Sequence, residues 1–201
     1  RITRLTILIV GPRRQSVFST STRCENGQGL VLRGCLDYSP TMSERCELKT
    51  FDLAVVGAGA AGQVAAIIAA EAGKQVVVLE QMPQAGMKIL ASGGGRANVT
   101  HEMAIDELWQ TFGRQGRFAL PALTLMGPPE LRALLARLGV QTVVDEQSRV
   151  YPTSQRAADV QKALGRRLDK LGVPVNLDCL VSRLWMEGRE LMGVETSQGN
   201  I

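Results

Sequence analysis

The chain has 201 residues, of which 45% are hydrophobic and 21% charged, a composition typical of a globular domain. Its net charge of +4 comes from residues 1–50, which hold eight Lys and Arg against four Asp and Glu, whereas residues 51–201 hold fifteen of each. A nucleic-acid surface needs a concentrated basic face with stacking aromatic residues. Because aromatic residues make up only 4% of the chain, we expect no nucleic-acid partner.

The four cysteines, at positions 24, 35, 46 and 179, form neither a CxxC pair nor a disulfide framework. We therefore expect no metal site and a reducing, cytoplasmic setting. The apolar run LTILIV, residues 5–10, is far shorter than the ~20 residues of a membrane helix. The sequence accordingly predicts no membrane span.

Residues 1–50 have the composition of a leader. They begin with Arg rather than Met, are rich in Ser, Thr and Arg, and contain no acid before Glu25. A transit peptide, an upstream stretch wrongly joined to the reading frame and a disordered extension all have this character. Because no amphipathic helical period is visible, we favour a disordered or non-native leader over a targeting segment.

A βαβ unit is predicted from Phe51 onward. LAVVGAG, residues 53–59, is a short apolar strand that ends in glycines, and residues 60–73 form a small, nearly all-apolar helix. KQVVVLE, residues 74–80, is a second strand whose continuous Val and Leu are typical of a buried parallel sheet. The connection is expected to be right-handed.

The rest of the chain predicts further helices and a meander. Helices are expected over residues 106–112, 127–139 and 153–172, the last capped by Thr153 or Ser154 and ended by Gly172. A strand is expected over residues 141–146. Residues 173–200 alternate apolar and polar positions around the turn EGRE, which predicts two or three antiparallel strands in a small meander.

The first chemical motif is GAGAAG, residues 57–62, between the first strand and its helix. Gly57 permits the tight turn, Gly59 lets a diphosphate approach the backbone, and Gly62 lets the helix pack close to the sheet. Glu80 ends the second strand, where a carboxylate accepts hydrogen bonds from ribose hydroxyls. The alternative is a glycine turn that binds no ligand, but the strand, the spacing and the acid together favour a dinucleotide.

A second glycine-rich stretch, Ser92 to Arg96, begins twelve residues after Glu80. Its backbone N–H groups can form an anion-binding concavity, with Lys88 and Arg96 on either side. Such a loop would approach the same diphosphate or the flavin ring beside it, which favours FAD over NAD. The alternative interpretation is a mobile surface loop.

Three separated blocks together resemble one family. GMKILASGGGRANVTH, residues 86–101, resembles the signature GxKxLxSGxGRCNxTN of the YhiN/BaiN-like (aminoacetone-oxidase-like) FAD-dependent flavoproteins. The GAGAAG turn with Glu80, and RVYPTSQRAADVQKAL at residues 149–164, are similar to the family's other blocks and follow the expected order. Ala97 stands where the family usually has Cys, and His101 where it has Asn.

The resemblance implies an α/β fold, a Rossmann-like FAD-binding domain of the glutathione-reductase type with a βαβ unit and a β-meander. Residues 51–201 would be its N-terminal portion, incomplete because the family's substrate domain and closing FAD segment are missing. The resemblance also implies that main chain at Val181 approaches the adenine. The other residues that it implies as FAD contacts are Gly57, Gly59, Ala61, Gly62, Glu80, Lys88, Ser92, Gly93, Gly94, Gly95, Arg96 and Asn98.

The sequence therefore favours a fragment of an FAD-dependent oxidoreductase that acts on a small-molecule substrate, with NAD(P)H as a candidate electron donor. An NAD-binding dehydrogenase module and a non-catalytic truncated remnant are the alternatives. No catalytic residue is assigned. His101, the only histidine, is expected to be a polar loop residue rather than a general base.

Overall fold

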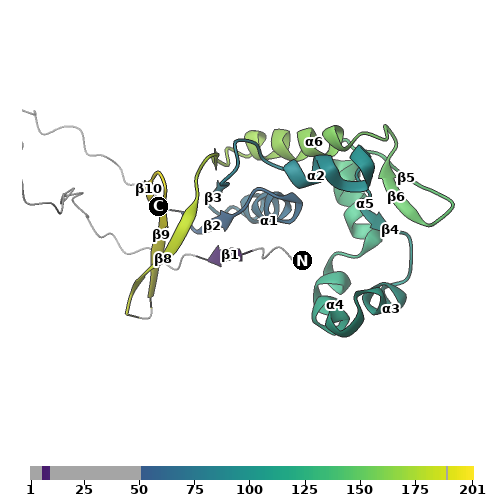
Figure 1. Ribbon diagram of the computed structural model, residues 1–201, viewed down its shortest axis with the longest axis horizontal. Helices are drawn as coiled ribbons and strands as arrows, with labels where there is room; N and C mark the ends of the chain where they lie inside the picture. Colours follow the sequence, from purple (N-terminus) through teal and green to yellow (C-terminus); the bar gives the residue numbers. More distant parts are fainter. Residues whose placement is uncertain (1–5, 10–50, 189) are drawn as a thin grey trace, which may run out of the picture. The chain divides into compact units, whose positions relative to one another are not determined.

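The computed structural model of the chain describes residues 6–9, 51–188 and 190–201 (Figure 1). Most of the leader predicted over residues 1–50 therefore lies outside the described residues. Within it, Thr6–Ile9 form strand β1, which the sequence did not predict. β1 pairs antiparallel with strand β2 (Leu53–Val56).

The predicted βαβ unit forms the centre of the main sheet. β2 is followed by helix α1 (Ala60–Glu71) and strand β3 (Val76–Leu79), and β2 and β3 pair in parallel. Strand β7 (Val175–Asn176) adds a third parallel strand beside β3, so the order is β1-β2-β3-β7. The prediction that this segment belongs to the meander was wrong. Because β3 is fully buried, the backbone N–H groups on its outer edge need acceptors. The Val78 N–H donates to the Pro174 carbonyl at 2.9 Å, and the Glu80 N–H donates to the Asn176 carbonyl at 2.8 Å.

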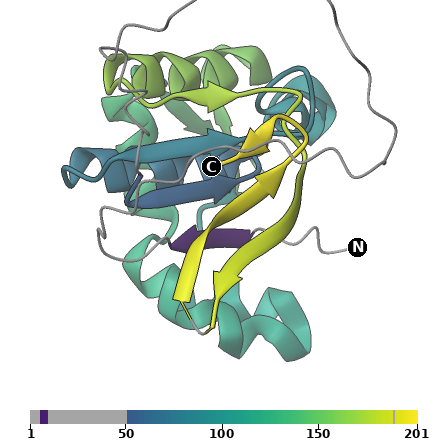
Figure 2. The ribbon, with the colours of Figure 1, turned by 90° about the vertical axis from the view of Figure 1, so that its left-hand side faces the viewer.

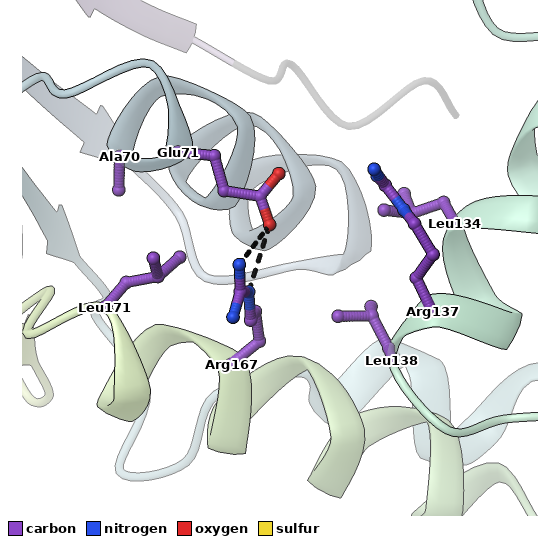
Figure 3. Close-up of a pocket in the computed structure, with 7 residues that line it drawn as sticks. All are labelled: Ala70, Glu71, Leu134, Arg137, Leu138, Arg167 and Leu171. Atoms are coloured by element: carbon purple, nitrogen blue, oxygen red, sulfur yellow. Dashed lines mark hydrogen bonds and ion pairs between the residues drawn. The ribbon is translucent and has the colours of Figure 1, made fainter.

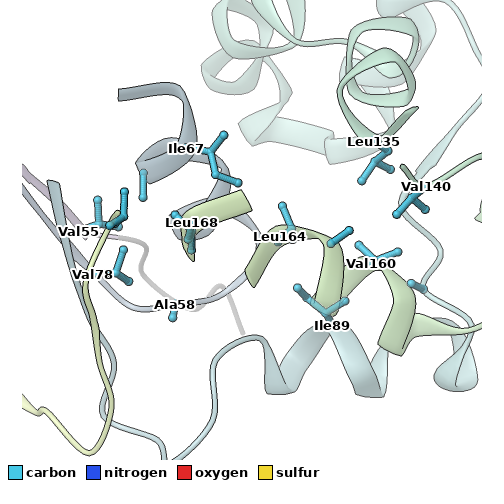
Figure 4. Packing of buried hydrophobic residues seen from close by; sticks show 14 of the residues in the cluster. Val55, Ala58, Ile67, Val78, Ile89, Leu135, Val140, Val160, Leu164 and Leu168 are labelled. Atoms are coloured by element: carbon cyan, nitrogen blue, oxygen red, sulfur yellow. The ribbon is translucent and has the colours of Figure 1, made fainter. Parts of the chain in front are cut away.

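Alternate residues of the parallel strands pack on opposite faces of the sheet, as the period of two requires. Val55 and Val78 face α1 and helix α6 (Ala157–Lys170), where they join the larger apolar cluster (Figure 4). Ala54 and Val77 face the other way and pack against Val194 of the C-terminal strands. β2 and β3 are thus covered on both faces, which explains why these two strands are continuously apolar.

The C-terminal strands form the predicted meander, which crosses the face of β2 and β3 opposite α1 (Figure 2). All its pairings are antiparallel, in the order β10-β9-β8. Its members are β8 (Val181–Glu187), β9 (Glu190–Thr196) and β10 (Gly199–Asn200).

A third sheet, also antiparallel, lies between the βαβ unit and β7 in the sequence, with its strands in the order β4-β6-β5. Its strands are β4 (Thr100–His101), β5 (Thr142–Val144) and β6 (Arg149–Pro152). Only β5 was predicted. The other helical elements are α2 (Met87–Ala91), η1 (Ser92–Gly95), α3 (Ile105–Leu108), η2 (Trp109–Gln115), α4 (Gly116–Leu125) and α5 (Pro128–Arg137).

The prediction that Thr153 or Ser154 caps α6 was wrong, because the helix begins only at Ala157. Its N-cap is Arg156, which makes no side-chain capping bond. Thr153 is still tied to the preceding sheet, since its N–H donates to the Gln141 carbonyl at 2.8 Å. Gln155 then turns the chain with a φ of +55° before the helix begins.

Candidate dinucleotide-binding site

The glycine turn after β2 has the geometry that its residues predict. Gly57 has a φ of +98°, which side chains rarely tolerate, and its N–H donates to the Leu79 carbonyl at 2.7 Å. A Cβ on Gly62 would overlap the carbonyl oxygen of Gly57 and lie 3.3 Å from Val55 Cγ1. Glycine at 62 therefore lets α1 approach the strand closely.

The amino end of α1 is open. Gly59 is its N-cap, with no side-chain capping bond, and a Cβ built on Gly59 would meet no atom within 4 Å. Ala61, in the first turn, is exposed. The backbone N–H groups of a first helical turn have no partner within the helix and favour an anion. The turn thus leaves room for an anionic group against the backbone.

Glu80 follows β3 and joins its end to the glycine turn. Its side chain is buried, with 9% of the residue exposed. Oε2 accepts a hydrogen bond from the Ala58 N–H at 2.6 Å, and Oε1 accepts one from the Met82 N–H at 3.0 Å. Each carboxylate oxygen can accept a further bond. The sequence predicted that Glu80 ends the second strand. It did not predict that the carboxylate accepts a hydrogen bond from the glycine turn.

Gln63 is a site residue that the sequence analysis missed. It is 1% exposed, and its Nε2 donates to the Ala58 carbonyl at 2.9 Å. The same carbonyl accepts the Gly86 N–H at 2.8 Å. The Ala58 carbonyl thus accepts two hydrogen bonds, one of which ties the segment that leads into α2 to the turn. A polar residue near the start of a helix that is apolar until its last residue was the available signal.

The second glycine-rich stretch folds as a tight left-handed turn rather than as an extended loop. The φ angles of Gly93, Gly94 and Gly95 are +55°, +64° and +84°, a run that favours glycine. Ala97 also has a positive φ, +59°, although it carries a Cβ and is buried. Ser92 begins the turn, and its hydroxyl donates to the Ile89 carbonyl at 2.7 Å.

Asn98 carries an unsatisfied acceptor beside this turn. Its Oδ1 is buried and has no hydrogen-bond partner. The turn folds back on this residue, since a Cβ on Gly93 would lie 2.7 Å from the Asn98 nitrogen. Because an unpaired buried acceptor is costly, the site suits a ligand that brings an N–H or O–H donor to Asn98.

Three side chains form a stacked cluster next to the turn. The Arg96 guanidinium lies 4.5 Å from the centroid of the Tyr151 ring, and Arg149 lies 5.8 Å from the same centroid. Arg96 Nη2 also donates to the Tyr151 hydroxyl at 3.4 Å. Lys88, the second predicted cation, is exposed on α2. The stacking on Tyr151 was not predicted, because β6 lies more than fifty residues from the turn.

The last predicted cofactor residue, Val181, lies at the start of the meander. Val181 begins β8 and packs against the cluster that contains Ala54 and Val77. Two residues earlier, the Cys179 N–H donates to the Glu80 carbonyl at 2.8 Å, which brings the start of the meander to the end of β3. His101 is not a loop residue: it lies in β4, opposite Arg149.

A cavity of about 540 Å³ lies between α1, α5 and α6 (Figure 3). Leucines line it together with Glu71 and Arg167, whose ion pair measures 2.8 Å. None of the predicted cofactor residues lines this cavity. It is therefore separate from the glycine turns.

Within the described part of the chain, no cluster of His, Cys, Asp and Glu could hold a metal ion. No helix in those same residues combines the length and apolar character needed to cross a membrane.

The predicted residues gather in two groups that α2 connects. The first is the turn from Gly57 to Gly62 with Glu80, and the second is the turn from Ser92 to Arg96 with Asn98. A glycine turn between a parallel strand and its helix, with an acid at the end of the next strand, defines a Rossmann-type dinucleotide-binding fold.

Comparison with known proteins identifies the family. Residues 51–201 match the family described as HI0933-like protein Rossmann domain, and the chain belongs to this family. The predicted fold class and the predicted resemblance to the YhiN/BaiN-like flavoproteins are thereby confirmed.

The chain is 34% identical over 139 residues to the 3-dehydro-bile acid delta(4,6)-reductase of Clostridium scindens. The match covers 68% of this chain and 33% of that relative, so the chain spans about a third of the relative's length.

Two solved structures share the fold. The 3-ketosteroid delta1-dehydrogenase of Sterolibacterium denitrificans superposes with a TM-score of 0.58 at 15% identity, covering 75% of this chain and 45% of that one. A flavocytochrome c3 fumarate reductase in its open conformation gives 0.55 at 21% identity, covering 73% and 30%.

Proposed function

We propose that the chain is the cofactor-binding part of an FAD-dependent oxidoreductase. The diphosphate would lie against the backbone at Gly59 and the amino end of α1, and Glu80 would accept hydrogen bonds from the adenosine ribose. The observation that carries the proposal is the bond between Glu80 and Ala58, 2.6 Å long, beside open space at Gly59. It brings the acid and the anion-binding turn to one edge of the sheet.

The second group of residues would bind the flavin half. Asn98 Oδ1 is buried without a donor, and a ribityl hydroxyl or a ring N–H of FAD would supply one. Arg96, beside the left-handed glycines, would place a positive charge near the anionic cofactor. Val181 would bring main chain to the adenine. These features fit FAD better than NAD, because NAD leaves no role for a second glycine turn.

The chemistry of the proposal comes from the cofactor. Bound FAD would supply the capacity to accept a hydride or an electron pair, and the protein would orient and tune it. We infer a small organic substrate, since the relative from Clostridium scindens is named as a bile acid reductase. NAD(P)H is the proposed electron donor, and the cytoplasm the proposed location.

A titration of the full chain with FAD tests the proposal. Oxidised flavin that is bound has a shifted visible spectrum and quenched fluorescence, and NAD added in excess should not displace it. Gly59→Ala should weaken FAD binding at least tenfold, because the new methyl occupies the space next to the backbone. Gly165→Ala is the matched control, since Gly165 lies in α6 and a Cβ there meets no atom within 4 Å.

Three results would count against the proposal. A chain that binds NAD but not FAD would support the dehydrogenase module, and one that binds neither would support a non-catalytic remnant. Equal FAD affinity in Gly59→Ala and Gly165→Ala would place the diphosphate elsewhere.

A further inference from the structure

We propose that Tyr151 is a positioning residue for Arg96. Its ring would hold the Arg96 guanidinium at the glycine turn, so that this charge meets the negative charge of the bound dinucleotide. The inference deepens the proposed FAD-binding function and rests on it for the identity of the ligand.

The Tyr151 ring is itself held in place. Tyr151 is 3% exposed and lies in β6, the central strand of its sheet, opposite Val143. One ring edge also borders the glycine turn, because a Cβ on Gly93 would lie 3.2 Å from Tyr151 Cε1. A ring fixed by the sheet and by the turn is a rigid support for a flexible side chain.

Arg96 meets the face of this ring. Its guanidinium carbon is 4.5 Å from the ring centroid, within the range of a cation–π contact, and Nη2 reaches the phenolic oxygen at 3.4 Å. Its Nε donates to the Gly93 carbonyl at 3.3 Å. Arg96 is otherwise exposed, so these contacts restrict a side chain that would lose much rotamer freedom on binding a ligand.

The two arginines on Tyr151 differ in their charge balance. Arg149 is neutralised by Asp145, whose Oδ2 accepts a hydrogen bond from Nε at 2.8 Å and forms an ion pair with Nη2 at 2.7 Å. Arg96 has no carboxylate among the ion pairs of the described residues. An exposed guanidinium with an aromatic support and no counter-charge is available to an anionic ligand. Of the two arginines that lie against Tyr151, Arg149 is paired with a carboxylate, whereas the charge of Arg96 is available to a ligand.

Two substitutions separate the ring face from the hydroxyl. Tyr151→Phe keeps the aromatic ring face and removes the hydroxyl. Tyr151→Leu keeps apolar bulk but removes the ring face. We expect the FAD dissociation constant of Tyr151→Phe to stay within about twofold of the parent, and that of Tyr151→Leu to rise about tenfold. In an Arg96→Ala background, Tyr151→Leu should cause no further loss. A merely structural role of Tyr151 would weaken binding equally in both backgrounds, and that result would overturn the proposal.

A measurement without ligand keeps the two proposals distinguishable. In an NMR spectrum of the full chain, the Arg96 Nε–H signal should be shifted by the ring current, remain so in Tyr151→Phe and move toward the free-arginine position in Tyr151→Leu. A signal at the free-arginine position in the parent would overturn the positioning role. If the parent shows the shifted signal but binds no FAD, the proposed function fails while the contact between Arg96 and Tyr151 stands.

Discussion

The carboxylate of Glu80 accepts a hydrogen bond from the backbone N–H of Ala58 at 2.6 Å, across twenty-two residues of sequence. This bond connects the end of β3 to the glycine turn that follows β2. Glu80 therefore shapes the turn in addition to its proposed contact with the ribose. One substitution removes both roles, and two separate measurements on that variant tell them apart.

Glu80→Ala should lower both stability and cofactor affinity. It leaves the N–H groups of Ala58 and Met82 without their acceptor, which we expect to cost about 1–3 kcal/mol of unfolding free energy. FAD binding should weaken by about 1.5–3 kcal/mol if the carboxylate also holds the ribose. Urea unfolding and FAD titration measure the two effects. Unchanged FAD affinity in the variant would place the ribose elsewhere.

Alanine should destabilise the ligand-free protein at Gly62 but not at Gly59. Gly62→Ala should destabilise the protein by about 1–3 kcal/mol without ligand, because its Cβ would overlap the Gly57 carbonyl. Gly59→Ala should leave the unfolding free energy nearly unchanged, since its φ is −70° and its Cβ would meet no atom. Thermal unfolding of the two variants without FAD checks the contrast. Equal melting temperatures would contradict the close approach of α1 to the turn.

Gly94→Val should abolish flavin retention while leaving the fold in place. Gly94 has a φ of +64°, so a side chain there is strained by about 1–2 kcal/mol, but no protein atom obstructs its Cβ. The loss of FAD would therefore come from the space that a ligand needs. Far-ultraviolet circular dichroism and the visible spectrum report the two properties. A variant as yellow as the parent would favour the mobile surface loop.

Asn98→Leu should separate stability from binding. It replaces an unsatisfied buried oxygen with apolar atoms, so the ligand-free protein should be at least as stable as the parent. FAD affinity should fall about tenfold or more, since a donor on the cofactor would lose its acceptor. Calorimetric melting with and without FAD measures both. A variant that binds FAD like the parent would remove Asn98 from the site.

The Asp145–Arg149 pair should make the hairpin of β5 and β6 sensitive to acid. The hydrogen-bonded Arg149 side chain lowers the pKa of Asp145 below its usual 3.8. A lowered pKa in the folded state means that the carboxylate stabilises the fold above the unfolded value and loses this effect as the pH falls through the folded value.

The effect can be isolated by comparing the parent with Asp145→Asn. The parent should melt at a higher temperature near neutral pH, and the difference should shrink below about pH 4. A difference that stays constant across this range would show that the charge of Asp145 is not responsible.

The sequence by itself determined the βαβ unit and the first glycine turn. Their signals are local: continuous valines predict β3, and a strand followed by GAGAAG predicts a turn and a helix within six residues. Gly57 and Gly62 have the roles that the motif assigns, because a positive φ and a close helix approach depend on neighbouring backbone. The position of Glu80 at the strand end follows from the same spacing.

The tertiary structure decided which segments that are distant in the sequence pair or make contact. β7 has two residues, and its pattern alone could not reveal that it completes a parallel sheet beside β3 rather than a meander. The contact between Arg96 and Tyr151 joins residues 55 apart, and it depends on the pairing of β4, β6 and β5. The unsatisfied oxygen of Asn98 depends on what surrounds it after folding. Local patterns carry backbone preferences, whereas partners across space are set by packing of the whole chain.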